Sequence, residues 1–294
     1  MSDHAVPPEL PPVSPPAGRM HILLGWVRAH KWKTFALFCA VCAVTEILTL
    51  PFYGVYRLRT DNPPQTALMR QRMREAESEG KALKIVQQWI PLSRVPRHVI
   101  NAIIVAEDGT FFEHGGIDWF EVQESMEKNL QERRAARGAS TITQQLAKNL
   151  FLSTSKDPIR KLKEVAITLM MEHTLTKQRI LELYLNIVEW GRGIFGIEAA
   201  AQAYFGKSAS ALTIDEAARL AAVIPSPLRH QPNTDSRYVV RRTGIVLGRM
   251  SARNWLPGVP AGAADTVRPD STAPAGSEAK ADSLAEEQGG DGGL

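Results

Sequence analysis

The feature that most constrains this chain is a predominantly apolar run of 23 residues near its N-terminus, Thr34 to Tyr56. A helix rises about 1.5 Å per residue, so a run of this length would reach roughly 34 Å, enough to cross a bilayer core of about 30 Å. The run is too long for a signal-peptide core, and no small-residue cleavage site follows it. We therefore expect a retained membrane-spanning helix, with the basic segment before it in the cytoplasm.

Two features of this run bear on that interpretation. Glu46 lies near the middle, where a charged side chain costs a few kcal/mol on insertion scales. An amphipathic helix lying on the membrane surface is therefore the alternative. Cys39 and Cys42, the two cysteines of the chain, are i and i+3 on the same helix, where neither a disulfide nor a zinc site is indicated. The rest of the chain has no cysteine and is compatible with an oxidising compartment.

Composition divides the chain into five segments. We expect 1–33 to be a disordered, proline-rich and basic cytoplasmic segment, 34–56 the membrane helix, 57–94 a stalk, 95–250 the folded domain and 251–294 a disordered tail. Lys+Arg exceed Asp+Glu by 35 − 31 = 4. This mildly basic balance suits a phosphate-bearing ligand or an anionic membrane surface. Zinc-finger spacing and an aromatic-plus-basic RNA signature are both lacking, so nucleic acid is not an expected partner.

Apolar residues of the folded domain recur at spacings of three and four, which predicts a mainly α-helical structure. Two of its apolar stripes are predicted to face the core. The first stripe consists of Trp119, Phe120, Val122 and Met126. The second consists of Ile159, Leu162, Ala166, Leu169 and Met170. A membrane-surface site is the alternative for the first stripe, because a basic loop follows it.

The first motif that suggests chemistry is the abrupt end of a buried apolar helix at Glu107 and Asp108, followed by two aromatics, His114 and two glycines. Burial beside apolar and aromatic groups raises the pKa of a carboxylic acid and prepares it for proton transfer. The glycines allow the chain to turn sharply. The alternative is an ordinary helix end with solvated acids.

A second motif lies in Gly138–Leu150, where Thr141 followed by Gln144 predicts a capping box and the start of a helix. Gln144 and Lys148 stand one turn apart on one face of that helix. Hydroxyls, amides and a lysine at a helix N-terminus suit an oxyanion such as phosphate. The alternative is an ordinary capped amphipathic helix, which does not explain two glutamines followed by Lys148 and Asn149.

A third motif follows Pro158, which fits the first position of a helix. Arg160, Lys161 and Lys163 surround Glu164 and would form a cationic patch for a diphosphate with an acid embedded in it. The alternative is a solvated i,i+4 pair, which contributes only about 0.3–0.5 kcal/mol.

Taken together, these segments resemble the peptidoglycan glycosyltransferase family (glycosyltransferase family 51), and in particular its membrane-anchored, single-domain members. The resemblance covers roughly residues 60–250 and rests on five motifs in family order. They are Glu107 to Gly116, Gly138 to Gln145 with Lys148 and Asn149, Arg160 to Glu164, Ile180 to Gly196, and Thr213 to Pro227. Ala139 departs from the family pattern by replacing a glycine. The resemblance implies a lysozyme-like helical glycosyltransferase domain behind a single N-terminal transmembrane helix.

The resemblance implies polymerisation of lipid II, a disaccharide-pentapeptide on undecaprenyl diphosphate, with inversion and release of the lipid diphosphate. Glu107 would be the general base on the acceptor hydroxyl, and Glu164 a second acid that supports the leaving diphosphate. The cations expected to neutralise that diphosphate are Lys148, Arg160, Lys161 and Lys163. The groups expected to position sugar and phosphate oxygens are Ser140, Gln144 and Asn149. Asp108 and His114 are expected in the substrate site, where their hydrogen bonds would shape the first motif.

The sequence requires no cofactor and offers no dedicated metal cage, although Mg²⁺ or Mn²⁺ could bind the substrate diphosphate. Expected partners are lipid II, the growing glycan strand and membrane lipid, with division or cell-wall synthesis proteins as candidates. We expect a single-pass inner-membrane protein with a periplasmic catalytic domain.

Two alternatives are a lysozyme-like lytic enzyme and an inactive membrane-anchored scaffold. The cationic motif around Glu164 argues against the first, because glycan cleavage needs no diphosphate site. The presence of both glutamates and of every basic position argues against the second.

Overall fold

The computed structural model describes residues 30–132, 140–154 and 157–256. The ends predicted to be disordered lie almost entirely outside these ranges, as do Gly138 and Ala139 of the second motif. The chain divides into two compact units, Met1–Leu50 and Pro51–Leu294.

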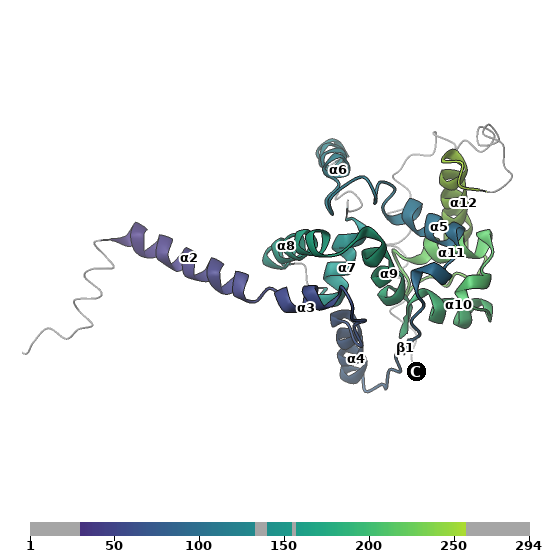
Figure 1. Ribbon diagram of the computed structural model, residues 1–294, viewed down its shortest axis with the longest axis horizontal. Helices are drawn as coiled ribbons and strands as arrows, with labels where there is room; N and C mark the ends of the chain where they lie inside the picture. The colour runs from purple at the N-terminus through teal and green to yellow at the C-terminus, as the bar shows by residue number, and fades with distance from the viewer. Residues whose placement is uncertain (1–29, 133–139, 155–156, 257–294) are drawn as a thin grey trace, which may run out of the picture. The chain divides into compact units, whose positions relative to one another are not determined.

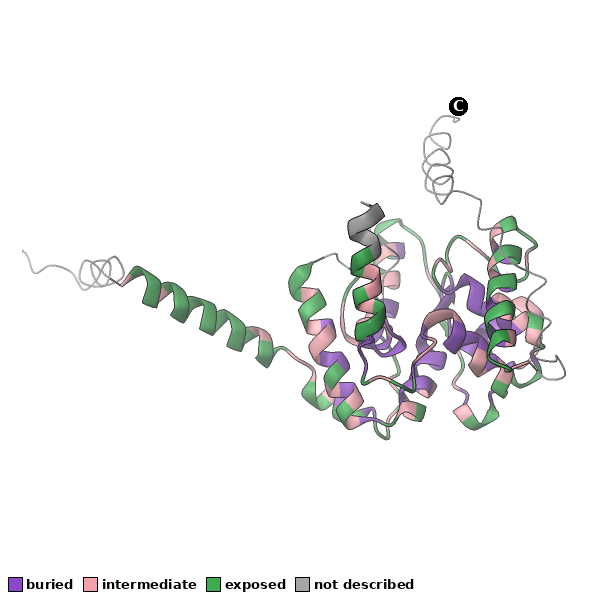
Figure 2. Ribbon diagram, turned by 90° about the horizontal axis from the view of Figure 1, so that it is seen from above, coloured by how far each residue is buried: buried purple, intermediate pink, exposed green. Residues whose placement is uncertain are grey.

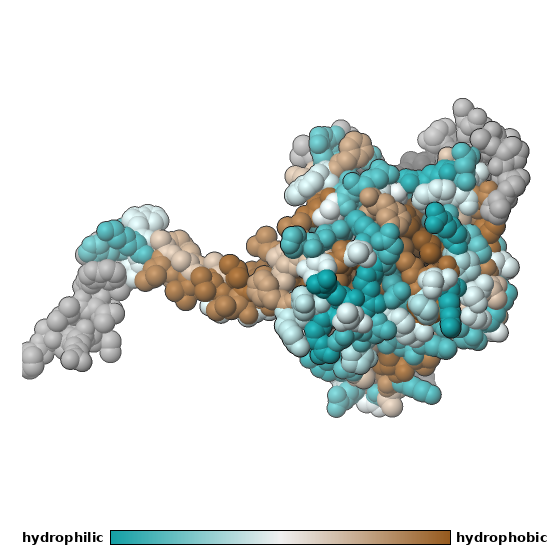
Figure 3. All heavy atoms as spheres, in the orientation of Figure 1, coloured by the Kyte–Doolittle hydropathy of each residue, from teal (hydrophilic) through white to brown (hydrophobic). Residues whose placement is uncertain are grey.

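The described part of the first unit is helix α2 (Lys31–Leu48), none of whose residues is buried (Figure 1). Its surface is hydrophobic over most of its length, beyond a hydrophilic N-terminal end (Figure 3). By length and composition, the segment Lys31–Arg57 could cross a membrane. The single helix predicted over 34–56 is divided, however, because Pro51 cannot donate a backbone hydrogen bond and disfavours helical geometry before it. Helix α3 (Phe52–Arg57) follows Pro51 and belongs to the second unit, where Val55 is buried.

The predicted stalk over 57–94 is wrong, because this segment is part of the folded domain. Helix α4 (Ala67–Ser78) buries Leu68 and Met69 against Phe195. Arg72 of the same helix pairs with buried Glu189, at 2.9 Å between Nη2 and Oε2. These contacts join residues more than 100 positions apart, so local composition could not reveal them.

A small three-stranded sheet also ties this segment to the domain. Strand β1 (Val86–Gln87) runs parallel to β3 (Ile194–Phe195), and β2 (Glu189–Gly191) runs antiparallel to β3. The order across the sheet is β1-β3-β2. The domain boundary therefore lies near Pro51 and not near residue 95.

The rest of the domain is helical, as predicted. In chain order its helices are η1 (Leu92–Arg94), α5 (Arg97–Glu107), α6 (Trp119–Glu132), α7 (Ile142–Phe151), α8 (Pro158–Thr174), α9 (Lys177–Ile187), α10 (Ile197–Phe205), η2 (Ala209–Ala211), α11 (Ile214–Val223) and α12 (Arg237–Ala252). Helices α7, α8 and α9 pack together, and α5 packs against α11 and α12 (Figure 1). Buried residues concentrate where these helices meet (Figure 2).

Both apolar stripes predicted to face the core are largely at the surface. On α6, Trp119, Phe120 and Met126 are 71%, 76% and 66% exposed. On α8, the exposed residues of the predicted stripe are Ile159, Leu162 and Leu169. Helix α8 instead buries a face that consists of Glu164, Ile167, Thr168 and Met171. The periodicity was correct, but a helix with apolar residues on two faces does not reveal which one the protein covers.

Candidate active site

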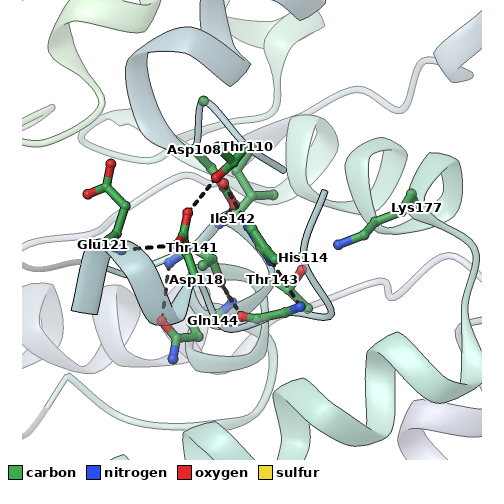
Figure 4. Close-up of polar contacts among 12 residues, drawn as sticks. Asp108, Thr110, His114, Asp118, Glu121, Thr141, Ile142, Thr143, Gln144 and Lys177 are labelled. Atoms are coloured by element: carbon green, nitrogen blue, oxygen red, sulfur yellow. Dashed lines mark hydrogen bonds and ion pairs between the residues drawn. The ribbon is translucent and has the colours of Figure 1, made fainter. Parts of the chain in front are cut away.

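The first motif is held by hydrogen bonds to Asp108, the residue directly after helix α5. One carboxylate oxygen accepts from His114 Nε2 at 2.9 Å, and the other accepts from the backbone N–H of Ile142 at 2.9 Å (Figure 4). His114 Nδ1 accepts from the backbone N–H of Gly116, so its proton is on Nε2. Asp108 and His114 thus make the hydrogen bonds expected of residues that shape the motif, and they join it to the start of α7.

Gly116 makes the turn out of this motif possible. Its φ of +92° lies in the region that favours glycine, and its carbonyl accepts a hydrogen bond of 2.6 Å from the Thr141 hydroxyl. A Cβ at this position would lie 2.7 Å from Cγ of Glu172 and 2.8 Å from Cγ2 of Thr168. A larger residue could not occupy the position without displacing α8.

Glu107 is the last residue of α5 and is half-buried. Its Oε2 accepts a hydrogen bond of 2.7 Å from Gln145 Nε2. Burial raises the pKa of Glu107, although the hydrogen bond from Gln145 and the positive charges of Arg242 and Lys148 oppose the shift. A carboxylate that remains ionised but has a raised pKa is a suitable general base near neutral pH.

The second motif begins with the predicted capping box. The Thr141 hydroxyl accepts from the Gln144 N–H at 3.2 Å, and the Gln144 side-chain oxygen accepts from the Thr141 N–H at 3.1 Å. Gln144 is 4% exposed, so its carbonyl serves the helix terminus rather than a ligand. The neighbouring Gln145, which the sequence analysis did not select, is the glutamine that contacts Glu107. Its i,i+3 spacing from Lys148 was a signal that could have identified it.

Lys148 lies in the electrostatic field of both glutamates. Burial lowers its pKa, and the negative charges of Glu164 and Glu107 partly offset that shift. Within the described ranges, no carboxylate comes within ion-pair distance of its ammonium group. Lys148 is therefore a half-buried cation that links the surroundings of Glu107 to those of Glu164.

Glu164 is buried, at 3% exposure, on the inward face of α8. Its two oxygens accept hydrogen bonds from Arg160 Nη1 at 2.6 Å and from Lys161 Nζ at 2.5 Å. The alternative of a solvated surface pair is therefore wrong. Two cations surround one carboxylate, so these three groups carry a net positive charge. Lys163, which precedes Glu164 in the chain, is half-buried.

The two remaining predicted residues lie on the second motif. Ser140 is half-buried and lies two residues before α7, and Asn149 on that helix is 7% exposed and follows Lys148 directly. Their predicted role in positioning ligand oxygens stays a prediction.

Helix α12 also contributes to the surroundings of Glu107, which the sequence did not predict. The positive charge of Arg242 acts on Glu107, while its Nε donates to the Ala222 carbonyl at 3.0 Å. Near the C-terminus of α12, Arg253 Nη1 donates to the Gly109 carbonyl at 2.7 Å. These residues lie more than 130 positions after Glu107 in the chain, and nothing in the local sequence indicates that they approach it.

In the part of the chain that the structure describes, no group of three or more His, Cys, Asp or Glu side chains is arranged to hold a metal ion.

Comparison with known proteins shows what this chain resembles. A family model described as Transglycosylase matches residues 76–251. A biosynthetic peptidoglycan transglycosylase of Nitrosospira multiformis is 43% identical over 221 residues, which cover 75% of this chain and 95% of the relative. One from a Janthinobacterium strain is 45% identical over 215 residues, 72% of this chain and 93% of the relative. One from Aromatoleum aromaticum is 49% identical over 184 residues, 63% and 80% of the two chains.

Proposed function

This chain belongs to the transglycosylase family and polymerises glycan strands in cell-wall synthesis, and we propose that Glu107 and the cations around Glu164 divide that reaction between them. The fold is the mainly helical, lysozyme-like one expected of the family. The substrates are lipid II and the growing glycan strand, both linked to a lipid diphosphate.

Glu107 is proposed as the general base. The 4-hydroxyl of the acceptor sugar loses its proton to Glu107 as its oxygen bonds to the anomeric carbon of the donor strand. The bond from that carbon to the diphosphate oxygen breaks, and the electron pair leaves with the diphosphate. Because attack and departure occur on opposite faces, the α linkage becomes β. The half-buried position and raised pKa of Glu107 support this role.

The cations of α7 and α8 are proposed to stabilise the departing diphosphate. Fixed positive charges are most effective where negative charge develops in the transition state. Glu164 orients Arg160 and Lys161 through the hydrogen bonds described above. Lys148 would contact the diphosphate directly. The observation that carries the proposal is the position of Lys148 on α7. Its ammonium group interacts electrostatically with both Glu107 and Glu164, and it therefore links the proposed base to the proposed anion site.

We propose that the protein is anchored in the inner membrane by α2, with its catalytic domain in the periplasm. The length and hydropathy of Lys31–Arg57 support an anchor. Confinement of enzyme and lipid-linked substrate to one surface raises their effective concentration. The exposed apolar side chains of α6 and α8 would suit contact with lipid. Division or cell-wall synthesis proteins in the same membrane are the protein partners we propose to look for.

A divalent cation is proposed only as an ion bound to the substrate diphosphate. Mg²⁺ or Mn²⁺ binds phosphate oxygens readily, so the ion would reach the cationic cluster on the diphosphate. Chelation followed by restoration of each metal would test this. Unchanged polymerisation after chelation would contradict it.

The function is tested by polymerisation of labelled lipid II with the full-length protein in detergent. We expect lysozyme-digestible polymer from the wild type and none from Glu107→Gln. Glu113→Gln is the matched control, because Glu113 is an exposed acid in the same motif. Binding of lipid II without polymer would favour the scaffold, and release of fragments from finished peptidoglycan would favour the lytic enzyme.

A further inference from the structure

A chain of two hydrogen bonds runs from the interior of the domain to Glu107. The hydroxyl of Tyr184 on α9 donates to Gln145 Oε1 at 3.0 Å. Gln145 Nε2 on α7 then donates to Glu107 Oε2 at 2.7 Å. Tyr184 is fully buried, so it cannot touch a substrate itself.

The direction of these bonds determines which end of the Gln145 amide faces Glu107. An amide side chain can rotate to exchange its oxygen and nitrogen at little steric cost, and its partners decide between the two orientations. Tyr184 stays protonated because burial, together with the negative charges of Glu107 and Asp108, raises its pKa well above the usual value. A neutral phenol that donates to Oε1 directs the amide N–H toward the carboxylate.

We propose that Tyr184 is a positioning residue that acts through Gln145 to hold Glu107 ionised and oriented for proton transfer from the acceptor hydroxyl. This rests on the proposed role of Glu107 as the general base. In the described part of the chain, the bond from Gln145 is the one hydrogen bond to the Glu107 carboxylate. It holds Oε2 and thereby sets the direction of Oε1.

Several charged or titratable groups face Glu107 and must be considered in any pH effect. They come from the end of its own helix, from α7, from α9 and from α12: Asp108, Lys148, Tyr184 and Arg242. Helix α11, which packs along α5, contributes only apolar side chains to its buried face. Removal of the neutral Tyr184 hydroxyl leaves all the charges around Glu107 in place and changes only the orientation of the amide.

Tyr184→Phe in the full-length protein tests the proposal. Without the phenol, the amide can turn its oxygen toward Glu107, which disfavours the ionised carboxylate. We expect kcat at neutral pH to fall about tenfold, less than the loss of about 100-fold or more caused by removal of a general base. The acidic limb of the pH–rate profile should move to higher pH, so that activity partly recovers as the pH rises. KM should stay close to that of the wild type.

Tyr204→Phe is the matched control. The hydroxyl of Tyr204 donates to a backbone carbonyl, that of Trp190, at 2.9 Å, away from Glu107. It should lower thermal stability without moving the pH profile. In a Gln145→Leu background, Tyr184→Phe should cause little further loss, because the connection is already broken.

An unshifted acidic limb in Tyr184→Phe, or full additivity with Gln145→Leu, would overturn the proposal. Such a result would leave the function intact if the wild type still polymerised lipid II and Glu107→Gln did not. Loss of polymerisation by the wild type would instead contradict the function itself.

Discussion

Two adjacent glycines of the first motif should respond very differently to the same small substitution. Gly116 has φ = +92°, and a Cβ there would lie 2.7 Å and 2.8 Å from side-chain carbons of Glu172 and Thr168 on α8. Gly115 has no atom within 4 Å of an added Cβ, and its φ is not positive. Gly115→Ala is therefore an internal control for Gly116→Ala.

The cost of Gly116→Ala has two parts. A left-handed backbone with a side chain costs about 1–2 kcal/mol, and overpacking against α8 adds about 1–3 kcal/mol. The total is roughly 2–5 kcal/mol, which corresponds to about 4–20 °C in Tm for a domain of this size. Polymerisation should also fall, because the N–H of Gly116 orients His114 and its carbonyl accepts from Thr141.

The measurement is thermal unfolding of both variants in the same detergent, followed by lipid II polymerisation below both transition temperatures. Gly115→Ala should stay within about 2 °C of the wild type, as expected of a surface substitution. Equal Tm values for the two variants would refute the reasoning, because the steric argument distinguishes them completely.

Three further predictions follow from buried charges. The pKa of Glu107 is raised in the fold, so the folded state binds its proton more tightly than the unfolded state does, and stability falls as pH rises above the usual glutamate range. Glu107→Gln should therefore have a higher Tm than the wild type at neutral pH, but not at pH values near the usual glutamate pKa. A Tm difference that does not change with pH would contradict this. Lys148→Met should lower kcat about 100-fold without lowering Tm, because it removes a desolvated cation; near-normal turnover would exclude Lys148 from the anion site. Arg72→Met should cost about 3–5 kcal/mol because it leaves buried Glu189 unpaired. Thermal unfolding beside Arg192→Met, which breaks an exposed pair, measures the difference, and equal Tm values would refute it.

Helix termini were the part of the fold that the sequence predicted best. The capping box at Thr141 and the proline at the first turn of α8 both occupy their predicted positions. Capping depends on residues three positions apart, so the necessary information is local. Glu107 was likewise identified because an apolar helix ends at it.

Contacts between distant segments were not predictable in this way. Arg72 and Glu189 are joined across the domain, and Arg242 acts on Glu107 from the last helix. For a related reason, the sequence predicted Gln144 in the site, whereas Gln145 is the glutamine that contacts Glu107. Both are glutamines on one turn of α7, and only the position of Tyr184, on another helix, shows which one reaches the site.

Helix α8 shows a different limit of prediction from sequence. Its apolar stripe was identified, but that stripe faces outward and not toward the core as predicted. Hydrophobic periodicity shows that one face of a helix is more apolar than the other. The conclusion that the more apolar face is buried assumes that the other face is in contact with water. Here Leu162 is 70% exposed and Glu164 is 3% exposed. In water this arrangement costs free energy, because an apolar side chain is exposed and a carboxylate is buried. Beside a bilayer the cost of the outward leucine disappears, and the inward carboxylate can hold Arg160 and Lys161 toward a lipid-linked diphosphate. The proposed membrane-facing surface and the proposed anion site would together account for the orientation of α8.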